Sequence, residues 1–340
     1  MRFGVGVWAD KPIEDLVRLC ERAEALGFDD VWFNDHYFVK DVYVVQALAA
    51  LKTKNIRFGT SITSPYQRHP AQLASTVRTL HELSGGRAIL GLGPGGFEYP
   101  ENLETPIPKP LTACRETIDI VRGLWTFEPV SAGGGVFRIK DARLEFGEPA
   151  DIPIYLGARG PRMHRLGGET CDGIIMHGAT ETHCRYVRDK VAEGAKRAGR
   201  DPGEVDICVL TDIVLTDDLE AAMEHLRPRC LIMAGGEYSL EVLEHYGLTL
   251  EEVAPLRQAV RNGDKQKALS LVTPAMANTF CIVGDASACL EKVRSLERAG
   301  LTHVIATAGL RQTVDFTLRS METYAECILE PYRTTSGKKE

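Results

Sequence analysis

Long apolar runs, an excess of basic charge and paired cysteines are all missing from this sequence of 340 residues. No stretch of about 18 consecutive apolar residues occurs, which excludes a membrane-spanning helix. Lys and Arg number 40 against 47 Asp and Glu, and the net charge of -7 argues against nucleic-acid binding, because neutralising phosphates requires a basic surface. The nine cysteines are scattered without a C-x-x-C pair, so neither a zinc ribbon nor a disulfide framework is indicated.

The motifs of two large hydrolase classes are also absent. A metal-dependent hydrolase would carry His-x-His after the first strand, but the sequence has Trp8-Ala9-Asp10 there, so we expect no metal site. No G-x-S-x-G elbow occurs, and serine hydrolysis therefore has no support. These absences favour oxidoreduction with a bound organic cofactor, which supplies reactivity that side chains lack. The chain opens on a strand pattern instead of a signal peptide, so we expect a cytoplasmic protein.

Strand and helix patterns alternate along the chain. In the first unit a buried strand over 3–8 precedes apolar residues at helical spacing over 12–26, and a glycine follows. The same succession of helix, glycine and strand occurs near the other end, where a helix at 286–299 leads into a strand at 301–305. Eight such units predict a (β/α)8 TIM barrel. An open doubly wound sheet is the competing interpretation, which the unbroken series and the lack of an N-terminal nucleotide fingerprint disfavour.

The other elements follow from the same patterns. The remaining strands are expected near 28–33, 56–62, 87–92, 152–156, 172–177 and 206–215. The remaining helices are expected near 43–53, 70–84, 110–127, 160–169, 182–199 and 313–329. Two segments depart from the alternation: a glycine- and proline-rich loop at 93–109 and a largely helical insertion at 217–280, between the seventh and eighth strands. We expect residues 1–340 to form one barrel domain whose insertion caps the catalytic mouth.

The active site of such a barrel forms from the loops that follow the carboxyl ends of its strands. Asp35 and His36 follow the second strand, and an imidazole there can bind or protonate a substrate near neutral pH. We predict a catalytic role for both, against the alternative that they only tie down a loop. Gly91, Gly93, Gly95 and Gly96 lie at and after the end of the fourth strand, but prolines follow and no helix opens there, so we reject a dinucleotide-binding interpretation.

A second group of candidates follows the fifth and sixth strands. Gly157 to Gly160 precede a new helix and include Arg159, and backbone N–H groups at a helix start beside an arginine make a phosphate site. A glycine-rich turn without a ligand explains the same residues equally well. His177 and Gly178 follow the sixth strand and would line the same side of the mouth.

The sequence resembles the bacterial luciferase-like superfamily of flavin- and deazaflavin-dependent (β/α)8 enzymes in three segments, at residues 32–37, 59–70 and 79–93. Within it the likeness is greatest to the coenzyme F420-dependent 5,10-methylenetetrahydromethanopterin reductases. The residues that carry it are Asp35-His36-Tyr37, Asn55 to Gly59, Thr63-x-Pro65-Tyr66-x-Arg68, Gly91 to Gly95 and Gly157-Ala158-x-Gly160-Pro161. The resemblance implies hydride transfer between F420, an 8-hydroxy-5-deazaflavin, and a one-carbon unit carried on a pterin.

The resemblance also assigns roles to individual residues. It implies that Asp35 and His36 border the deazaflavin ring and that a cis peptide bond at Ser61–Ile62 backs it. The residues that it implies in cofactor binding are Ser61, Ile62, Thr63, Gly93, Gly157, Ala158, Arg159, Gly160, His177 and Gly178. It further implies a small-molecule substrate and a homodimer or homotetramer.

Two departures leave alternatives open. Gly6 and Gly96 stand where the reductases carry acidic residues, and this affects the choice of pterin as substrate more than the choice of cofactor. One alternative is an FMN-dependent monooxygenase of the luciferase or alkanesulfonate type. The other is a non-catalytic protein that binds a flavin or deazaflavin.

Overall fold

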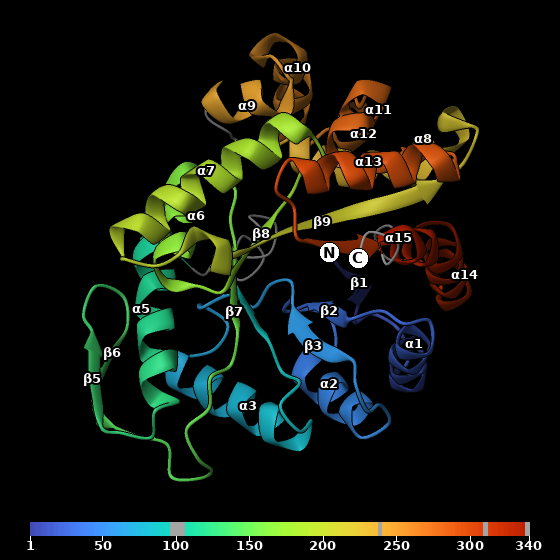
Figure 1. The fold of residues 1–340 in the computed structure, drawn as a ribbon. Helices are drawn as coiled ribbons and strands as arrows, with labels where there is room; N and C mark the ends of the chain where they lie inside the picture. The colour runs from blue at the N-terminus through green and yellow to red at the C-terminus, as the bar shows by residue number, and fades with distance from the viewer. Residues whose placement is uncertain (96–105, 237–239, 309–311, 337–340) are drawn as a thin grey trace.

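The computed structural model describes residues 1–95, 106–236, 240–308 and 312–336. Within these residues, eight parallel strands lie in the order β3-β2-β1-β11-β9-β8-β7-β4 (Figure 1). Bridges between Phe58 and Ala88 and between Thr63 and Leu92 join β3 to β4 and close the ring. The barrel strands are β1 (Arg2–Trp8), β2 (Asp30–Asn34), β3 (Arg57–Thr60), β4 (Leu90–Leu92), β7 (Ile154–Gly157), β8 (Gly173–Met176), β9 (Asp206–Leu215) and β11 (His303–Thr307). The predicted (β/α)8 barrel is confirmed.

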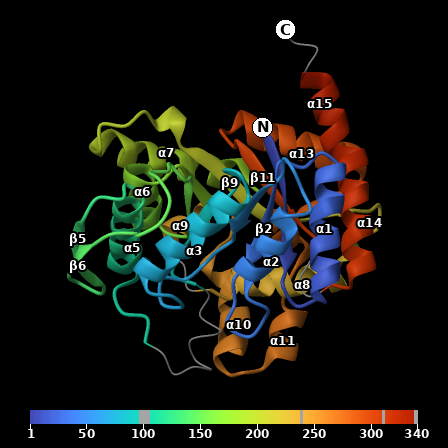
Figure 2. The same cartoon turned by 90° about the horizontal axis from the view of Figure 1, so that it is seen from below.

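Helices cover the outside of the strands, and α14 lies beside α1 (Figures 1 and 2). These helices are α1 (Ile13–Ala25), α2 (Val42–Ala50), α3 (Pro70–Leu83), α5 (Pro110–Leu124), α6 (Pro161–Thr170), α7 (Glu181–Arg197), α13 (Ala286–Arg298), α14 (Val314–Tyr324) and α15 (Glu330–Ser336). The positions of α1 to α14 in this group agree with the predicted helices to within a few residues, whereas α15 extends beyond the last helix predicted, at 313–329. A π-helical turn at Ala325–Leu329 continues α14 into α15.

The predicted helical insertion between the seventh and eighth barrel strands is also confirmed. It consists of α8 (Leu219–Ala234), α9 (Leu240–Tyr246), α10 (Leu250–Arg261), α11 (Lys265–Ser270) and α12 (Pro274–Phe280). A short strand that was not predicted, β10 (Ile282–Gly284), follows the insertion and pairs with the far end of β9. The barrel strands are thus joined to the insertion through one continuous strand, because β9 pairs with β8 and β11 over its first part and with β10 over its last.

An antiparallel hairpin that the sequence patterns did not predict lies between α5 and β7. Its strands are β5 (Val130–Gly133) and β6 (Arg138–Ala142), and they are half-buried or exposed. The carboxylate of Glu116 on α5 accepts hydrogen bonds from the backbone N–H groups of Gly135, Val136 and Phe137, which fastens the hairpin to the helix.

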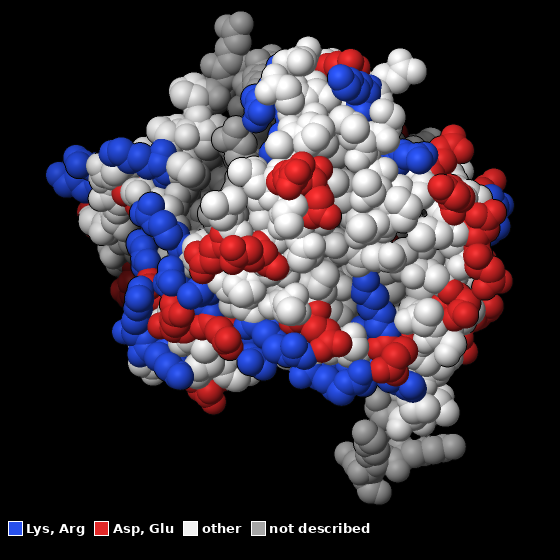
Figure 3. Space-filling view, turned by 90° about the horizontal axis from the view of Figure 1, so that it is seen from above, with Lys and Arg blue, Asp and Glu red and all other residues white. Residues whose placement is uncertain are grey.

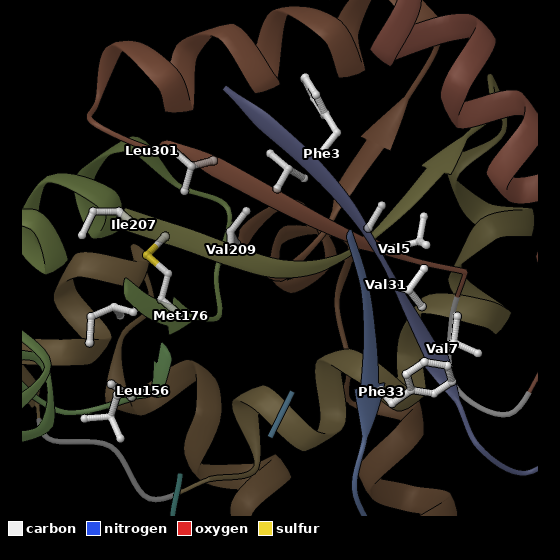
Figure 4. Close-up of a cluster of buried hydrophobic side chains, with 14 of the residues drawn as sticks. Phe3, Val5, Val7, Val31, Phe33, Leu156, Met176, Ile207, Val209 and Leu301 are labelled. Atoms are coloured by element: carbon white, nitrogen blue, oxygen red, sulfur yellow. The ribbon is translucent and has the colours of Figure 1, made fainter. Parts of the chain in front are cut away.

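Alternation along the strands divides their side chains between two environments. Phe3, Val5 and Val7 of β1 and Val31 and Phe33 of β2 are almost completely buried and point out of the barrel toward the helices (Figure 4). The residues between them point into the barrel, since successive side chains of a strand face opposite sides. Parallel strands with both faces covered need apolar residues at nearly every position, which explains why the short strand segments of the sequence are almost entirely apolar.

A buried charged network closes the end of the barrel where the strands begin. His303 Nε2 lies 2.9 Å from Asp30 Oδ1, and Arg57 Nη2 donates to Asp30 Oδ2 at 3.0 Å. Trp32 Nε1 also donates to the Asp30 carboxylate. Burial acts to raise the pKa of Asp30, but His303, Arg57 and Trp32 outweigh it and lower the pKa to about 2.

None of the helices in the described residues is long and apolar enough to cross a membrane. On the face seen from above, basic and acidic side chains are interspersed around a largely uncharged centre (Figure 3).

Candidate active site

The inner faces of the barrel strands carry an apolar layer. It consists of Trp32, Ile89, Tyr155, Ile175, Cys208, Leu210 and Ile305. A Cβ at Gly6 would meet Leu210, and a Cβ at Gly59 would meet Trp32, so both glycines face this layer.

Residues two positions further along the same strands point inward at the carboxyl ends, where barrel enzymes have their sites. We call these residues the mouth layer: Trp8, Asn34, Ser61, Gly157, His177, Asp212 and Thr307.

The imidazole of His36 stacks on the indole of Trp8 at this mouth. The ring centroids lie 4.7 Å apart and the ring planes differ by 13°. Trp8 is the last residue of β1 and is in register with Asn34 of β2, so the parallel pairing of the two strands brings the rings together. The stack fixes the plane of the half-buried imidazole.

Asp35 is buried and ion-paired. Its Oδ2 accepts hydrogen bonds from Arg68 Nη1 at 2.6 Å and from Thr63 Oγ1 at 2.8 Å. Thr63 Oγ1 also bonds the hydroxyl of Tyr43 at 2.8 Å. Burial raises the pKa of Asp35 above its ordinary value, although Arg68 and Thr63 act in the opposite direction. These bonds join the loop after β2 to the segment after β3 and favour a positioning role for Asp35 next to His36.

The peptide bond between Ser61 and Ile62 is cis, as the resemblance implies. Asn34 Nδ2 donates to the carbonyl oxygen of Ser61 at 3.0 Å. The Ile62 side chain packs against the apolar layer between Gly93 and Gly157. A Cβ at Gly93 would lie 2.5 Å from Ile62 Cδ1, and a Cβ at Gly157 would lie 2.9 Å from Ile62 Cγ2. We call Ile62 with these two glycines the Ile62 platform, an apolar surface at the mouth.

Helix α6 begins beside the platform. Gly157 ends β7, Ala158 is buried, Arg159 is half-buried, and Gly160 precedes Pro161, the first helical residue. The next residue is a second arginine, and the first turn contains no carboxylate. The positive end of a helix dipole and nearby guanidinium groups both attract anions. The local charge therefore suits the predicted phosphate site, which stays a prediction.

His177 lies in the mouth layer as a neutral side chain. Burial, and then the positive charges of Arg159 and Arg229, lower its pKa to about 3. Its Nδ1 lies 3.2 Å from the Leu210 carbonyl oxygen, which can only accept, so Nδ1 carries the proton and Nε2 is an acceptor. Gly178 follows with a φ of 92°, in the left-handed region that favours glycine.

Four buried polar atoms of the mouth layer have no hydrogen-bond partner among the described residues. They are Trp8 Nε1, Asn34 Oδ1, Ser61 Oγ and Asp212 Oδ2. Each buried polar atom without a partner costs about 1–3 kcal/mol, so their grouping in one layer points to a polar ligand.

In the part of the chain that is described, no group of three or more His, Cys, Asp or Glu side chains could hold a metal ion.

The structure brings most of the predicted site residues together around the mouth but adds others that sequence reasoning missed. Trp8, Asn34, Asp212 and Thr307 were not proposed as site residues. The strand alternation that places them inward is present in the sequence, and counting two positions from each inner apolar residue would have found them. The departure at Gly96 lies outside the described residues.

Comparison with known proteins identifies the family. The sequence profile of the family described as luciferase-like monooxygenase matches residues 1–303. The chain belongs to this luciferase-like family.

Among luciferase-like relatives, the 5,10-methylenetetrahydromethanopterin reductase of Methanolobus tindarius is 34% identical over 307 residues, which cover 90% of this chain and 94% of the relative. The structure of the coenzyme F420-dependent tetrahydromethanopterin reductase from Methanopyrus kandleri superposes with a TM-score of 0.86 and 29% identity, covering 97% of this chain and 98% of that one. The F420-dependent glucose-6-phosphate dehydrogenase of Amycolatopsis mediterranei is 27% identical over 313 residues, covering 86% of this chain and 87% of the relative. These luciferase-like enzymes act on different substrates.

Proposed function

We propose that the protein is an oxidoreductase that transfers a hydride between coenzyme F420 and a carbon substrate, which is 5,10-methylenetetrahydromethanopterin or a related pterin. The observation that carries the proposal is the Ile62 platform, an apolar surface beside which the Trp8–His36 stack and the start of α6 lie. The relatives whose names include F420 support the cofactor, and the two reductases support the pterin.

The mouth fits a flat deazaflavin with an anionic tail. Gly93 and Gly157 leave room for the Ile62 side chain, which fills the space where their Cβ atoms would lie and gives the platform an apolar surface for a flat ring. Ser61 Oγ and Trp8 Nε1 are buried without partners, and the polar edges of such a ring would provide hydrogen-bond partners for them. Arg159 and the start of α6 offer positive charge to the tail.

F420, when bound, supplies the hydride that it carries at C5. In reduction of a methylene bridge between two nitrogens, the carbon gains the hydride and one nitrogen gains a proton. We assign the handling of this proton to His36, because an imidazole exchanges protons near neutral pH and Trp8 holds this one in a fixed plane. Asp35, fixed by Arg68 and Thr63, holds the loop that carries His36. The neutral His177 offers Nε2 as an acceptor on the opposite wall.

Titration of the purified protein with oxidised F420, and separately with FMN, tests the cofactor. Absorbance and fluorescence report the binding, and we expect F420 to bind tightly and FMN weakly. We then expect F420-dependent turnover of methylenetetrahydromethanopterin. A preference for FMN, with oxygen consumed only when reduced FMN is supplied, would instead make the protein a monooxygenase. Binding of F420 without turnover of any acceptor would make it a non-catalytic cofactor-binding protein.

The Ile62 platform makes a separate prediction for Gly157→Ala. The added Cβ would lie 2.9 Å from Ile62 Cγ2, so the isoleucine must shift. Overpacking of this kind lowers the free energy of unfolding by about 1–3 kcal/mol, and because the isoleucine is displaced from the surface that would hold the ring, we expect the F420 affinity to fall by about tenfold. Gly203→Ala is the control, because its Cβ would meet only the flexible Asp201 carboxylate, at 3.3 Å. Unchanged F420 affinity in a folded Gly157→Ala protein would contradict the platform's role.

The homodimer or homotetramer stays a prediction. Phe38 and the outer side of α2, with Val44, Leu48 and Leu51, expose apolar side chains that such an assembly would cover.

A further inference from the structure

An ion pair of the mouth layer has no part in the mechanism above. Asp212 of β9 follows Leu210 of the apolar layer by two residues and is 1% exposed. Arg229 comes from α8 of the insertion, and its Nε and Nη2 donate to Asp212 Oδ1 at 3.3 and 3.1 Å. Thr307 at the end of β11 bonds the same oxygen, and Arg229 Nη2 donates to Thr307 Oγ1 at 3.0 Å. The insertion thus delivers a charged side chain to the interior of the barrel.

The two oxygens of the Asp212 carboxylate have different environments. Oδ1 takes all the hydrogen bonds from Arg229 and Thr307, whereas Oδ2 is buried without a partner among the described residues. A buried carboxylate oxygen is stabilised only by a donor, and a carboxylate that is ionised can only accept. The missing partner of Oδ2 is therefore an N–H or O–H group that the described chain does not provide.

The neighbouring strand makes room for this arrangement. Gly6 of β1 is in register with Thr307, and a Cβ at Gly6 would lie 2.5 Å from Thr307 Cγ2. Thr307 therefore occupies the space that a side chain at position 6 would need. Thr307, packed into this space, holds the Asp212 carboxylate of β9 from the side of β1.

The charge of the pair also limits what it can bind. Arg229 Nε and Nη2 are directed at Asp212 and Thr307, so these groups are not available to a phosphate. The ion pair has no net charge and contains a buried acceptor oxygen without a partner, which suits an uncharged ring that carries N–H or amino donors. A reduced pterin carries such donors.

We propose that Asp212, held by Arg229 and Thr307, accepts a hydrogen bond from an N–H donor of the pterin and thereby orients the substrate at the mouth. Asp212 is a positioning residue for the substrate, and Arg229 fixes its carboxylate. This inference rests on the proposed function and adds the residues that select the substrate.

Two variants test it. Asp212→Asn keeps the shape of the side chain and presents an amide that is not ionised. The double variant Asp212→Leu/Arg229→Met removes both charges together, because a buried pair replaced by apolar residues leaves no unpaired charge to destabilise the fold. For wild type and variants, we would measure Tm, the Kd of F420, the Kd of tetrahydromethanopterin, and KM and kcat for methylenetetrahydromethanopterin.

We expect both variants to melt cooperatively and to bind F420 as wild type does. The Kd of tetrahydromethanopterin and KM should rise by about tenfold or more, the loss expected for a hydrogen bond to a charged group. Asp172→Asn is the matched control: this carboxylate pairs with Arg122, before β8 and away from the mouth, and its loss should leave pterin binding unchanged.

The outcomes separate the two proposals. Wild-type protein that binds neither F420 nor tetrahydromethanopterin would overturn the proposed function, and this inference with it. Wild-type protein that binds both, together with variants that bind F420 and retain the wild-type pterin Kd and KM, would overturn only the role of Asp212.

Discussion

Replacing His36 by alanine is expected to lower kcat for F420-dependent turnover by about 10²- to 10⁴-fold, the usual contribution of a positioned acid–base group. F420 binding should persist, because the Ile62 platform and the start of α6 are unchanged. The measurement is a pair of assays on one preparation, steady-state kinetics and F420 titration. In the plot of kcat against pH, the part of the curve that depends on the imidazole should disappear, since alanine does not titrate.

Two controls make the result specific to His36. His225→Ala removes an exposed histidine of α8 and should leave kcat unchanged. His36→Asn keeps a polar side chain that cannot exchange protons near neutral pH, so its kcat should resemble that of the alanine variant. Unchanged turnover in His36→Ala would end the proposed role of the imidazole.

Asp30→Asn is expected to cause a large loss of stability. It removes the charge that pairs with Arg57 and His303 at the closed end of the barrel, and breaking a buried ion pair from one side costs about 3–5 kcal/mol. Urea unfolding at neutral pH measures this loss. Asp151→Asn is the control, since that carboxylate is 97% exposed and its substitution should change the free energy of unfolding little.

The same residue predicts how stability depends on pH. The pKa of Asp30 is about 2 in the folded protein and 3.8 ordinarily, so the unfolded chain binds its proton at higher pH. Its contribution, about 2 kcal/mol, is complete above about pH 4 and is lost as the pH falls through about 2. The wild-type free energy of unfolding should fall over this window more steeply than that of Asp30→Asn. Parallel curves for the two proteins would contradict the assignment.

Much of the fold could be predicted because barrel strands and helices carry strong periodic patterns. The hairpin of β5 and β6 was missed because its strands are only four and five residues long and half-bury small or few apolar side chains, so their alternating pattern is too short to stand out. Strand β10 was missed because three residues are too short for a pattern, and its pairing with β9 is made only in the folded chain.

The candidate site was partly predictable for a different reason. Asp35 and His36 stand directly after a clear strand, so position alone marks them. Asp212 is surrounded in sequence by buried apolar residues, and its partners Arg229 and Thr307 are 17 and 95 residues away. No local pattern reports such a contact, and only the closed ring of strands brings these groups together.

The entry of Arg229 into the barrel from the insertion has a consequence for how such enzymes diverge. The Ile62 platform, the Trp8–His36 stack and the start of α6 all come from the first half of the chain, whereas the Asp212–Arg229 pair and Thr307 come from the second. The proposed cofactor contacts, apart from His177 and Gly178, and the proposed substrate contacts then lie in separate stretches of sequence. Exchange of residues beyond Gly178 with those of a relative offers a route to new substrates in which the hydride donor stays the same.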